Sequence, residues 1–297
     1  MLKMTNRCGF VAIVGRPNVG KSTLINAILG RKISIVTPKP QTTRHRILGV
    51  YTTNDSQIIF IDTPGLHRSA TKTINRMMNR IAASALSDAD LILFVSEATR
   101  WTVEDQDVLF KLKQSPIPIM ALPNKIDKIH PKEELLSVLS VMSDRHTFDE
   151  VLPISAKLND NLDRLIDLIP NYLPESPPLY PEEILTDRNE SFQIAEIIRE
   201  KLTLLLRQEV PYGLTVQIER MEKERKGINI NAVIWIERDS QKGIVIGKGG
   251  KILKKVGRMA RLELKERLNM PVHLDLWVKV KNNWSDNEKE LMRLGYD

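Results

Sequence analysis

Residues 15–22 read Gly15-Arg16-Pro17-Asn18-Val19-Gly20-Lys21-Ser22, which matches the phosphate-binding pattern G-x-x-x-x-G-K-[ST]. The apolar run Phe10 to Val14 precedes this motif, and a helix-like segment follows it. Gly15 and Gly20 can adopt backbone angles closed to other residues, so successive N–H groups can form an anion nest at a helix N-terminus. A glycine-bearing turn with a chance lysine is the alternative. The strand, the motif and the helix in register favour a nucleoside triphosphate site.

This phosphate loop and a second motif supply groups for the phosphates and for a metal ion. Lys21 would reach the β- and γ-phosphates, and Ser22 would ligate Mg²⁺. The strand-like run Ile58 to Ile61 ends at the sequence Asp62-Thr63-Pro64-Gly65. We expect Asp62 to hold Mg²⁺ through water and the Gly65 N–H to meet the γ-phosphate. The expected nucleotide-binding residues of this region are Gly15, Asn18, Val19, Gly20, Lys21, Ser22, Thr23, Asp62 and Gly65.

The segment Asn124-Lys125-Ile126-Asp127 would select the base. It follows the apolar run Ile117 to Leu122 and so falls at the carboxyl end of a buried strand. Guanine presents a ring N–H beside an exocyclic amine, and Asp127 can accept both as a charge-assisted pair. Adenine lacks this pair of donors and would leave a desolvated carboxylate unpaired, so the sequence predicts GTP. The small residues of Ser155-Ala156-Lys157 end the run Val151 to Ile154 and would bring backbone N–H groups to the guanine oxygen.

A polar, proline-punctuated loop, Pro38 to Arg46, lies between the phosphate loop and the second motif. It would become ordered when Thr42 or Thr43 ligates Mg²⁺ beside a γ-phosphate, and the sequence does not decide between the two threonines. A solvated basic surface loop is the alternative. The residues expected to act on the γ-phosphate are Lys21, Thr43 and Gly65, and the candidate metal ligands are Ser22, Thr42, Thr43 and Asp62.

Together these motifs resemble the G1 to G5 boxes of the translation-factor-related GTPases of the TrmE-Era-EngA group, spread here from Gly15 to Lys157. The resemblance implies an α/β P-loop GTPase domain with a doubly wound mixed sheet. It also implies GTP and GDP as ligands, Mg²⁺ as cofactor and slow intrinsic hydrolysis of GTP.

One departure from the Ras-like pattern bears on mechanism. Leu66 stands where Ras-type enzymes carry the glutamine that orients the attacking water. Leu66 cannot hydrogen-bond a water, so the backbone, a switch residue or a partner would have to position it. Asn18 matches a position that in some relatives helps to bind K⁺, which makes a K⁺-dependent rate of hydrolysis a hypothesis.

Length and composition fit a cytoplasmic protein of two domains. The chain has 297 residues, of which 42% are hydrophobic, enough for two cores. No stretch approaches the roughly 18 to 20 apolar residues of a membrane span. The start, Met1 to Cys8, lacks the apolar segment of a signal peptide. Cys8 is the only cysteine, which excludes intramolecular disulfides and favours a reducing compartment.

Proline marks the boundary between the domains. The segment Pro174-Glu175-Ser176-Pro177-Pro178-Leu179-Tyr180-Pro181 cannot continue a helix, because its rings remove N–H donors and keep the preceding residues extended. We therefore expect a G domain over residues 1–173, a semi-rigid proline-rich linker over 174–190 and a second domain over 191–297. Lys and Arg outnumber Asp and Glu in this second domain.

The second domain has the pattern of an α+β unit. Apolar residues at helical spacing predict an amphipathic helix over 191–208. A glycine turn, Gly247-Lys248-Gly249-Gly250, precedes a longer helix, Lys251 to Leu268. Alternating apolar and polar residues predict strands over Leu214 to Met221, Ile228 to Glu237 and Val272 to Val280. This order of elements resembles a type II KH domain, whose G-x-x-G loop lets a nucleic-acid backbone approach closely.

Charge along the longer helix supports a nucleic-acid surface independently of the glycine turn. Four of its cations are spaced three, four and three residues apart, which places them on one helical face opposite a phosphate backbone: Lys251, Lys254, Arg258 and Arg261. A solvated basic face is the alternative. The coincidence of the basic face with the glycine turn favours a ligand, and we expect single-stranded RNA and not DNA. The predicted RNA-binding residues are Ile246, Gly247, Lys248, Gly249, Gly250, Lys251, Lys254, Lys255, Arg258 and Arg261.

Within the TrmE-Era-EngA group, a G domain followed by a KH domain implies a small-subunit ribosome assembly factor. The resemblance implies binding near the 3′ end of 16S ribosomal RNA on the 30S subunit, with some peripheral association with the inner membrane. We expect GTP to order the loop at 38–46 and thereby to change the exposure of the basic helix. The terminal segment Trp284 to Leu294 is expected to be a short helix that either contacts RNA or, as we favour, caps the domain.

Two other classes of function remain open from the sequence. A GTP-dependent RNA-modifying enzyme would need a second catalytic constellation, but the five histidines are scattered and no His/Cys cluster has metal-ligand spacing. A peripheral membrane GTPase would use the same cations against anionic lipid. Binding to single-stranded RNA and to anionic vesicles, each titrated with salt, would separate these classes.

Overall fold

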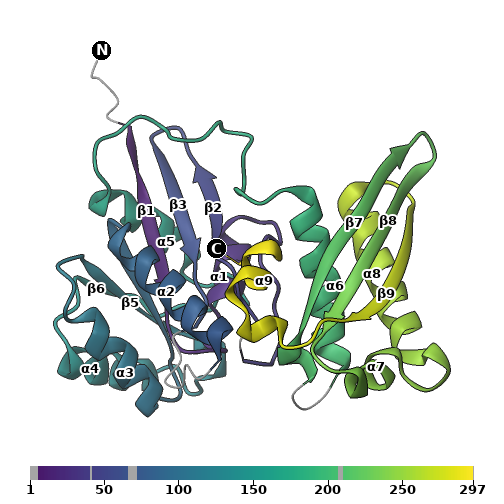
Figure 1. Ribbon diagram of the computed structural model, residues 1–297. Coiled ribbons are helices and arrows are strands. Elements are labelled where there is room, and N and C mark those ends of the chain that lie inside the picture. Colours follow the sequence, from purple (N-terminus) through teal and green to yellow (C-terminus); the bar gives the residue numbers. More distant parts are fainter. Residues whose placement is uncertain (1–5, 41, 66–71, 207–209, 297) are drawn as a thin grey trace. The chain divides into compact units, whose positions relative to one another are not determined.

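The computed structural model describes residues 6–40, 42–65, 72–206 and 210–296 (Figure 1). These residues form two units. The first takes its described residues from 1–34, 43–70 and 75–187, and the second takes them from 35–42, 71–74 and 188–297. Each unit has a β-sheet and an apolar core of its own.

A six-stranded mixed sheet forms the centre of the first unit. Its strands are β1 (Arg7–Val14), β2 (Ile47–Thr52), β3 (Ser56–Asp62), β4 (Leu91–Glu97), β5 (Ile119–Asn124) and β6 (Glu150–Val151). They lie in the order β2-β3-β1-β4-β5-β6, with β2 antiparallel to β3 and the other neighbours parallel. The predicted doubly wound mixed sheet is confirmed. The carboxyl ends of β1, β3, β4 and β5 share one edge, where such sheets bind ligands.

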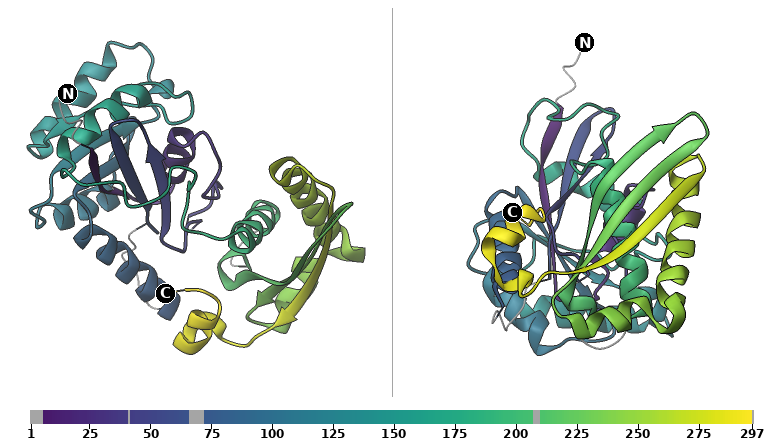
Figure 2. Two further views of the ribbon diagram at one scale, coloured as in Figure 1. Left: turned by 90° about the horizontal axis from the view of Figure 1, so that it is seen from above. Right: turned by 45° about the vertical axis from the view of Figure 1, so that its right-hand side comes forward.

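Helices cover both faces of this sheet (Figure 2). They are α1 (Lys21–Ile28), α2 (Thr73–Ser87), α3 (Val103–Leu112), α4 (Glu134–Arg145) and α5 (Leu162–Leu168), with 3₁₀ turns η1 (Ile126–Lys128) and η2 (Ile169–Tyr172). Every residue of β3 is buried, as a strand covered on both sides must be. No helix among the described residues combines the length and the apolar character that a bilayer crossing requires.

The last strand of this sheet is shorter than the sequence suggests. An apolar run predicts a strand over Val151 to Ile154, but β6 ends at Val151. Leu152 and Ile154 still donate their N–H groups to the Ala121 and Pro123 carbonyls of β5, both at 2.9 Å, but Pro123 has no N–H to donate in return, so the regular ladder ends. Ile154 nevertheless forms an isolated parallel bridge with Asn124, which keeps the following residues beside the end of β5.

The proline-rich segment is bonded to the first unit. The Pro174 carbonyl accepts the Cys8 N–H at 3.1 Å, and the Leu185 carbonyl accepts the Val50 N–H at 3.0 Å. Between them the Gln57 side chain bonds both the backbone N–H and the carbonyl of Tyr180, at 2.9 and 2.8 Å. We expected a semi-rigid spacer here. The segment is held along the sheet instead, and it covers backbone groups of the edge strand β2.

The second unit has the predicted order of helices and strands. Its elements are α6 (Glu190–Leu205), η3 (Val210–Gly213), β7 (Leu214–Glu224), β8 (Gly227–Ile236), α7 (Asp239–Ile246), η4 (Lys248–Gly250), α8 (Lys251–Leu268), β9 (Val272–Val280), η5 (Trp284–Asp286) and α9 (Glu288–Arg293). Strand β8 is central, antiparallel to β7 and parallel to β9. The type II KH arrangement is therefore confirmed.

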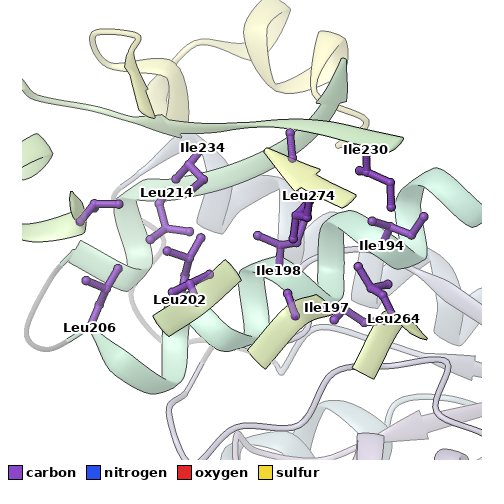
Figure 3. Packing of buried hydrophobic residues seen from close by; sticks show 14 of the residues in the cluster. Ile194, Ile197, Ile198, Leu202, Leu206, Leu214, Ile230, Ile234, Leu264 and Leu274 are labelled. Carbon is purple, nitrogen blue, oxygen red and sulfur yellow. The ribbon is translucent and has the colours of Figure 1, made fainter. Parts of the chain in front are cut away.

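One face of this sheet packs against α6 and α8 (Figure 3). Ile194, Ile198 and Leu202 of α6 lie against the inward residues of β8, and Leu264 extends the cluster from α8. The alternation along β8 explains this packing, because residues at every second position point to the same face. All four of these side chains are fully buried.

Helix α6 also buries charged side chains. Arg199 is 1% exposed and pairs with Glu196 at 2.6 Å. Glu200 is buried as well and accepts the backbone N–H of Val36 at 3.1 Å. Residues 35–42 therefore lie with the second unit in space, although the sequence places them inside the predicted G domain.

The terminal segment packs on the second unit. Trp284 and Tyr296 are fully buried and lie against each other, with ring centroids 5.9 Å apart. The Trp284 indole donates to the Gly213 carbonyl at 3.3 Å, and the Tyr296 hydroxyl lies 3.2 Å from that of Thr215. These contacts place the segment in the position expected of a cap on the domain.

Candidate functional site

The phosphate loop joins β1 to α1 in a conformation that requires glycine. Gly20 has φ 108°, in the left-handed region. A Cβ atom at Gly15 would lie 2.2 Å from the Val95 carbonyl oxygen, and one at Gly20 would lie 2.3 Å from Asn124 Nδ2. The loop therefore fits closely between β4 and the base-selecting segment. Its backbone N–H groups begin the α1 helix, where the dipole favours an anion.

Lys21 folds back over this loop. Its Nζ donates to the Gly15 carbonyl at 2.8 Å and to the Arg16 carbonyl at 3.0 Å. The side chain is buried, and this burial lowers the pKa of Lys21 to about 8. A cation held in this position by backbone carbonyls can turn toward phosphate oxygens in the adjoining nest.

Hydroxyl groups gather around the carboxylate of Asp62. Ser22 Oγ lies 2.9 Å from Thr43 Oγ1 and donates to Asp62 Oδ2 at 2.9 Å. Ser34 Oγ donates to the same oxygen at 2.7 Å. Burial raises the pKa of Asp62, and among the described residues its Oδ1 has no hydrogen-bond partner. A buried carboxylate with a free oxygen beside two hydroxyls fits a hydrated hard cation.

The structure distinguishes the two threonines of the polar loop. The Thr42 hydroxyl bonds Thr37 and the Lys39 carbonyl, both at 2.7 Å, whereas Thr43 lies with Ser22. Arg44, which follows Thr43, is only 2% exposed. This burial contradicts the alternative of a merely solvated loop.

Gly65 lies against the phosphate loop, since a Cβ atom there would be 3.1 Å from the Pro17 ring. Its backbone is thus close enough to meet a terminal phosphate. Leu66, which we expect not to position the attacking water, lies outside the described residues. In the part of the chain that the structure describes, no three His, Cys, Asp or Glu side chains are grouped so that they could hold a metal. The candidate metal site consists of the hydroxyls of Ser22 and Thr43 and the carboxylate of Asp62.

Asn124 ties the base-selecting segments to the phosphate loop. Its Nδ2 donates to the Val19 carbonyl at 2.8 Å, and its Oδ1 accepts the Ala156 N–H at 3.0 Å. Asp127 accepts a hydrogen bond from Ser155 Oγ at 2.6 Å. The structure therefore brings together four motifs that are far apart in sequence, and it places the Asp127 carboxylate where Ser155 fixes its orientation.

Three predicted nucleotide residues are less tightly placed or act through other atoms. Lys125 has φ 69°, and its Nζ donates to the Asn18 carbonyl at 2.8 Å. Thr23 is half-buried in the first turn of α1. Lys157 is exposed, and its contribution to the site would come from its backbone.

Sequence reasoning missed three polar residues of this site. Ser34 bonds Asp62, and Glu97 and Asp105 both bind the side chain of Arg16. Glu97 ends β4 at the carboxyl edge of the sheet, so its position carried the same signal as Asp62. Ser34 and Asp105 belong to no motif, and only the fold brings them to the phosphate loop.

The glycine turn of the second unit lies between α7 and α8. Gly247, Gly249 and Gly250 have φ of 74°, 61° and 75°, which L side chains rarely adopt. No described atom lies within 4 Å of a Cβ built at Gly249, so this residue faces open space. Lys248 beside it is exposed, and Ile246 before it is half-buried. The turn thus offers bare backbone to a ligand.

A groove of about 300 Å³ begins at this turn. Gly250, Lys254 and Arg261 border it, as the sequence predicts for an RNA surface. The cations Lys251, Lys255 and Arg258 are exposed but do not line it. Three residues of β9 also line it and were not among the predicted RNA-binding residues: Leu274, Asp275 and Leu276.

Comparison with known proteins finds matches for both parts of the chain. A family model described as 50S ribosome-binding GTPase matches residues 10–125, and a KH domain model matches residues 209–285. The chain is 50% identical to GTPase Era of Vibrio parahaemolyticus over 291 residues, which cover 97% of this chain and 91% of the relative. It is 51% identical to GTPase Era of Coxiella burnetii over 290 residues, 98% of each chain.

Solved structures resemble the whole chain. One is Era in complex with MgGDPNP and nucleotides 1506–1542 of 16S ribosomal RNA, with a TM-score of 0.94 and 41% identity, covering 98% of this chain and 99% of that one. Another is an Aquifex aeolicus Era variant bound to GDP and AlF4⁻, with a TM-score of 0.93 and the same identity and coverage.

Proposed function

The chain belongs to the Era family of GTPases, and from this premise we propose that it is a molecular switch. We propose that it binds 16S ribosomal RNA near the 3′ end of that RNA and assists assembly of the 30S subunit. The relative that was solved with MgGDPNP and a 16S fragment supports this proposal. So does the arrangement of both candidate sites in this chain. The proposed G domain spans residues 1–173, and the proposed KH domain spans 191–297.

The observation that carries the proposal is the geometry around Asn124. One side chain contacts the phosphate loop through the Val19 carbonyl and the guanine-side backbone through the Ala156 N–H. Asp127 then lies at the same edge, oriented by Ser155. A carboxylate so placed would accept the paired donors of guanine, and an adenine nucleotide would leave it unsatisfied.

For the metal, we propose that Ser22 and Thr43 ligate Mg²⁺ and that Asp62 holds it through water. The three groups already lie within hydrogen-bond reach of one another. The free Oδ1 of Asp62 would accept a metal-bound water. When bound, Mg²⁺ supplies positive charge to the phosphate oxygens during hydrolysis. Thr42, the alternative ligand, has its hydroxyl engaged elsewhere.

Lys21 and Gly65 complete the proposed catalytic groups. Lys21 would neutralise the β- and γ-phosphates, and the Gly65 N–H would bond a γ-phosphate oxygen. A side chain at position 66 cannot orient water, so we propose that a backbone group does so. Asn18, with φ 64° in the phosphate loop, is the proposed K⁺ contact. Equal hydrolysis rates in K⁺ and Na⁺ would exclude that role.

For RNA, we propose that the turn at 247–250 and its groove take single-stranded RNA. The turn exposes backbone at Gly249, and Lys254 and Arg261 line the groove beside it. Leu274 and Leu276 of β9 offer apolar surface to bases, while the cations suit phosphates. The exposed cations Lys248, Lys251, Lys255 and Arg258 would contact the RNA backbone beyond the groove.

The test is nucleotide and RNA binding by the full chain. We expect GDP and GTP to bind with Mg²⁺ and ADP not to bind measurably. Gly249→Asp should weaken binding of a 16S 3′-end oligonucleotide by about tenfold or more, because it adds a negative charge where the phosphates pass. Gly249→Asn, which suits the same positive φ, is the matched control and should lose far less.

Peripheral membrane association remains an alternative use of the same cations, and a GTP-dependent RNA-modification factor is another alternative. Binding of the full chain to anionic vesicles of phosphatidylglycerol tests the membrane function. Binding that depends on lipid composition, with no dependence on RNA sequence, would replace the RNA proposal with a membrane one.

A further inference from the structure

Glu97, the last residue of β4, binds three cations at once. Its Oε2 lies 3.1 Å from an Arg16 guanidinium nitrogen and 3.3 Å from Lys125 Nζ. Its Oε1 lies 3.4 Å from Lys128 Nζ. The Glu97 side chain is only 15% exposed. None of the nucleotide motifs contains Glu97, and the site as proposed gives it no role.

The first of these cations comes from the phosphate loop. Arg16 follows Gly15, and its side chain points toward β4 and α3. Its Nε donates to Asp105 Oδ2 at 2.9 Å. Asp105 is fully buried and also accepts the N–H of Thr102 in the capping box of α3. Arg16 is thus clamped between two carboxylates, each fixed by a different element.

The second cation comes from the base-selecting segment. Lys125 Nζ bonds Glu97 and also donates to the Asn18 carbonyl of the phosphate loop at 2.8 Å. One oxygen of Glu97 therefore joins a residue of the phosphate loop to a residue of the base-selecting segment. Burial alone would raise the pKa of Glu97, but Lys125, Arg16 and Lys128 outweigh it and lower that pKa, so the carboxylate is charged at neutral pH.

We infer that Glu97 is a positioning residue that couples the phosphate loop to the base-selecting segment and thereby slows release of guanine nucleotide. The inference rests on the proposed guanine-nucleotide function and names a residue that controls it. Arg16 and Lys125 are long side chains whose freedom must be lost when the site is ordered. Because Glu97 fixes both beforehand, the bound nucleotide meets a preorganised site.

A competing effect has the opposite sign. A carboxylate near a phosphate site repels the ligand, so removal of the charge would by itself slow nucleotide release. Three cations lie within 3.4 Å of Glu97 and offset its charge locally. Positioning should therefore dominate, and the direction of the change in release rate separates the two effects.

The experiment measures release of a fluorescent GDP analogue from the full chain in excess GDP. Glu97→Gln keeps the shape and removes the charge, whereas Glu97→Asp keeps the charge and shortens the reach. We expect release to be about five- to tenfold faster in both, since loss of a bridging contact acts mainly on dissociation. Glu104→Gln makes the same chemical change at an exposed residue of α3 and should release GDP at the wild-type rate.

Lys128→Met tests whether the bridge between Arg16 and Lys125, rather than any contact of Glu97, sets the release rate. Lys128 binds the other oxygen of Glu97 and is 56% exposed, so its loss should leave the release rate unchanged. Single-turnover hydrolysis of bound GTP and the unfolding midpoint, measured on each variant, distinguish positioning from a general loss of structure. Only the release rate should change.

Unchanged or slower release in Glu97→Gln and Glu97→Asp would overturn the inference. So would equal acceleration in Lys128→Met, because it would show that loss of any partner of this cluster speeds release, whether or not it bridges the phosphate loop and the base-selecting segment. If the variants with faster release also show slower hydrolysis and a lower unfolding midpoint, the role of Glu97 is structural. That result would overturn the inference too. Failure of the wild-type protein to prefer GDP over ADP would refute the proposed function itself, whichever result the variants give.

Discussion

In the proposed site the choice of purine depends on one side chain, that of Asp127, and its hydrogen-bonding chemistry can be reversed. In Asp127→Asn one acceptor becomes a donor, which matches the carbonyl that xanthine carries in place of the guanine amine. Loss of two charge-assisted hydrogen bonds should weaken GDP binding on the order of 10²- to 10³-fold. Xanthosine diphosphate should bind the variant better than GDP does. Titration calorimetry with GDP, XDP and ADP gives the three affinities.

A matched variant separates recognition from folding. Ser155→Ala removes the hydrogen bond of 2.6 Å to Asp127 but keeps the carboxylate, so it should weaken GDP only about fivefold and preserve the order GDP over XDP. If Asp127→Asn still prefers GDP to XDP, the base is selected by other groups.

Lys21 predicts proton uptake on nucleotide binding. Its pKa is about 8 in the free protein because burial disfavours the charged form, whereas an unburied lysine titrates near 10.5. Phosphates in contact with Nζ should restore the charge, so at pH 8.5 binding takes up most of one proton. Affinity for GDP should then fall as pH rises from about 8 toward 10.5 and be nearly constant below 7.

Calorimetry at pH 8.5 in two buffers with different ionisation enthalpies measures this uptake directly. Lys21→Met should bind GDP more weakly and take up no proton. The direction of this pKa shift also determines how the stability of the nucleotide-free protein changes with pH. The folded pKa lies below the unfolded value, so Lys21 alone makes stability rise between pH 8 and 10.5. Proton uptake that persists in Lys21→Met would assign it to another group.

At the scale of residues, the motifs predicted which segments come together around the phosphate loop but not the side chains that support them. The place of Asn124 at the end of a buried strand was sufficient to predict that it lies at the edge of the sheet where ligands bind. Ser34 and Asp105 act on other side chains, and no rule of spacing links them to Asp62 or Arg16. Such supports depend on which strands are neighbours, and they could not be predicted from the sequence alone.

Helix α6 gives a prediction at the scale of an element, because it buries an ion pair. Arg199 and Glu196 are 2% and 8% exposed at their side chains. Removing one partner leaves the other charged and buried, so Arg199→Met should reduce the free energy of unfolding by about 3 kcal/mol. Urea denaturation followed by tryptophan fluorescence measures it, since Trp235, Trp277 and Trp284 all lie in the second unit.

The control is another pair with the same i,i+3 spacing. Arg293 and Glu290 are 3.6 Å apart, but Arg293 is 77% exposed, and loss of such a pair typically changes stability by under about 1 kcal/mol. Arg293→Met should therefore change the unfolding midpoint little. Equal effects of the two variants would mean that burial does not set the strength of the pair.

Elements were predicted best where periodicity alone decides them. Alternation of apolar and polar residues predicted the bounds of β9, Val272–Val280. Helical spacing and the preceding glycines predicted the bounds of α8, Lys251–Leu268. The strand expected from Val151 to Ile154 is shorter than predicted because Pro123 of the neighbouring strand β5 has no N–H to donate to it. The proline-rich segment was expected to be a spacer because composition reports stiffness and not the bonds that Gln57 and β2 make with it.

For the whole molecule, the central question is whether nucleotide and RNA binding are coupled. A switch requires that RNA affinity differ between the GTP-bound and GDP-bound states, and the two sites belong to one chain of the Era family. Coupling of binding free energies is reciprocal, so RNA must change the affinity for nucleotide by the same factor. Two independent measurements therefore test one quantity.

We expect the 16S 3′-end oligonucleotide to bind the complex with a non-hydrolysable GTP analogue at least about fivefold more tightly than the GDP complex. The same RNA should then tighten binding of the GTP analogue relative to GDP by the same ratio. Fluorescence anisotropy with labelled RNA gives the first ratio, and competition between the two nucleotides with and without RNA gives the second.

Gly249→Asp should remove the effect of RNA on nucleotide binding. It should leave the nucleotide affinity measured without RNA unchanged, since Gly249 lies in the second unit. Equal RNA affinities in the GTP, GDP and nucleotide-free states would leave both sites intact and refute the switch, because a ligand that favours neither state cannot shift the balance between them.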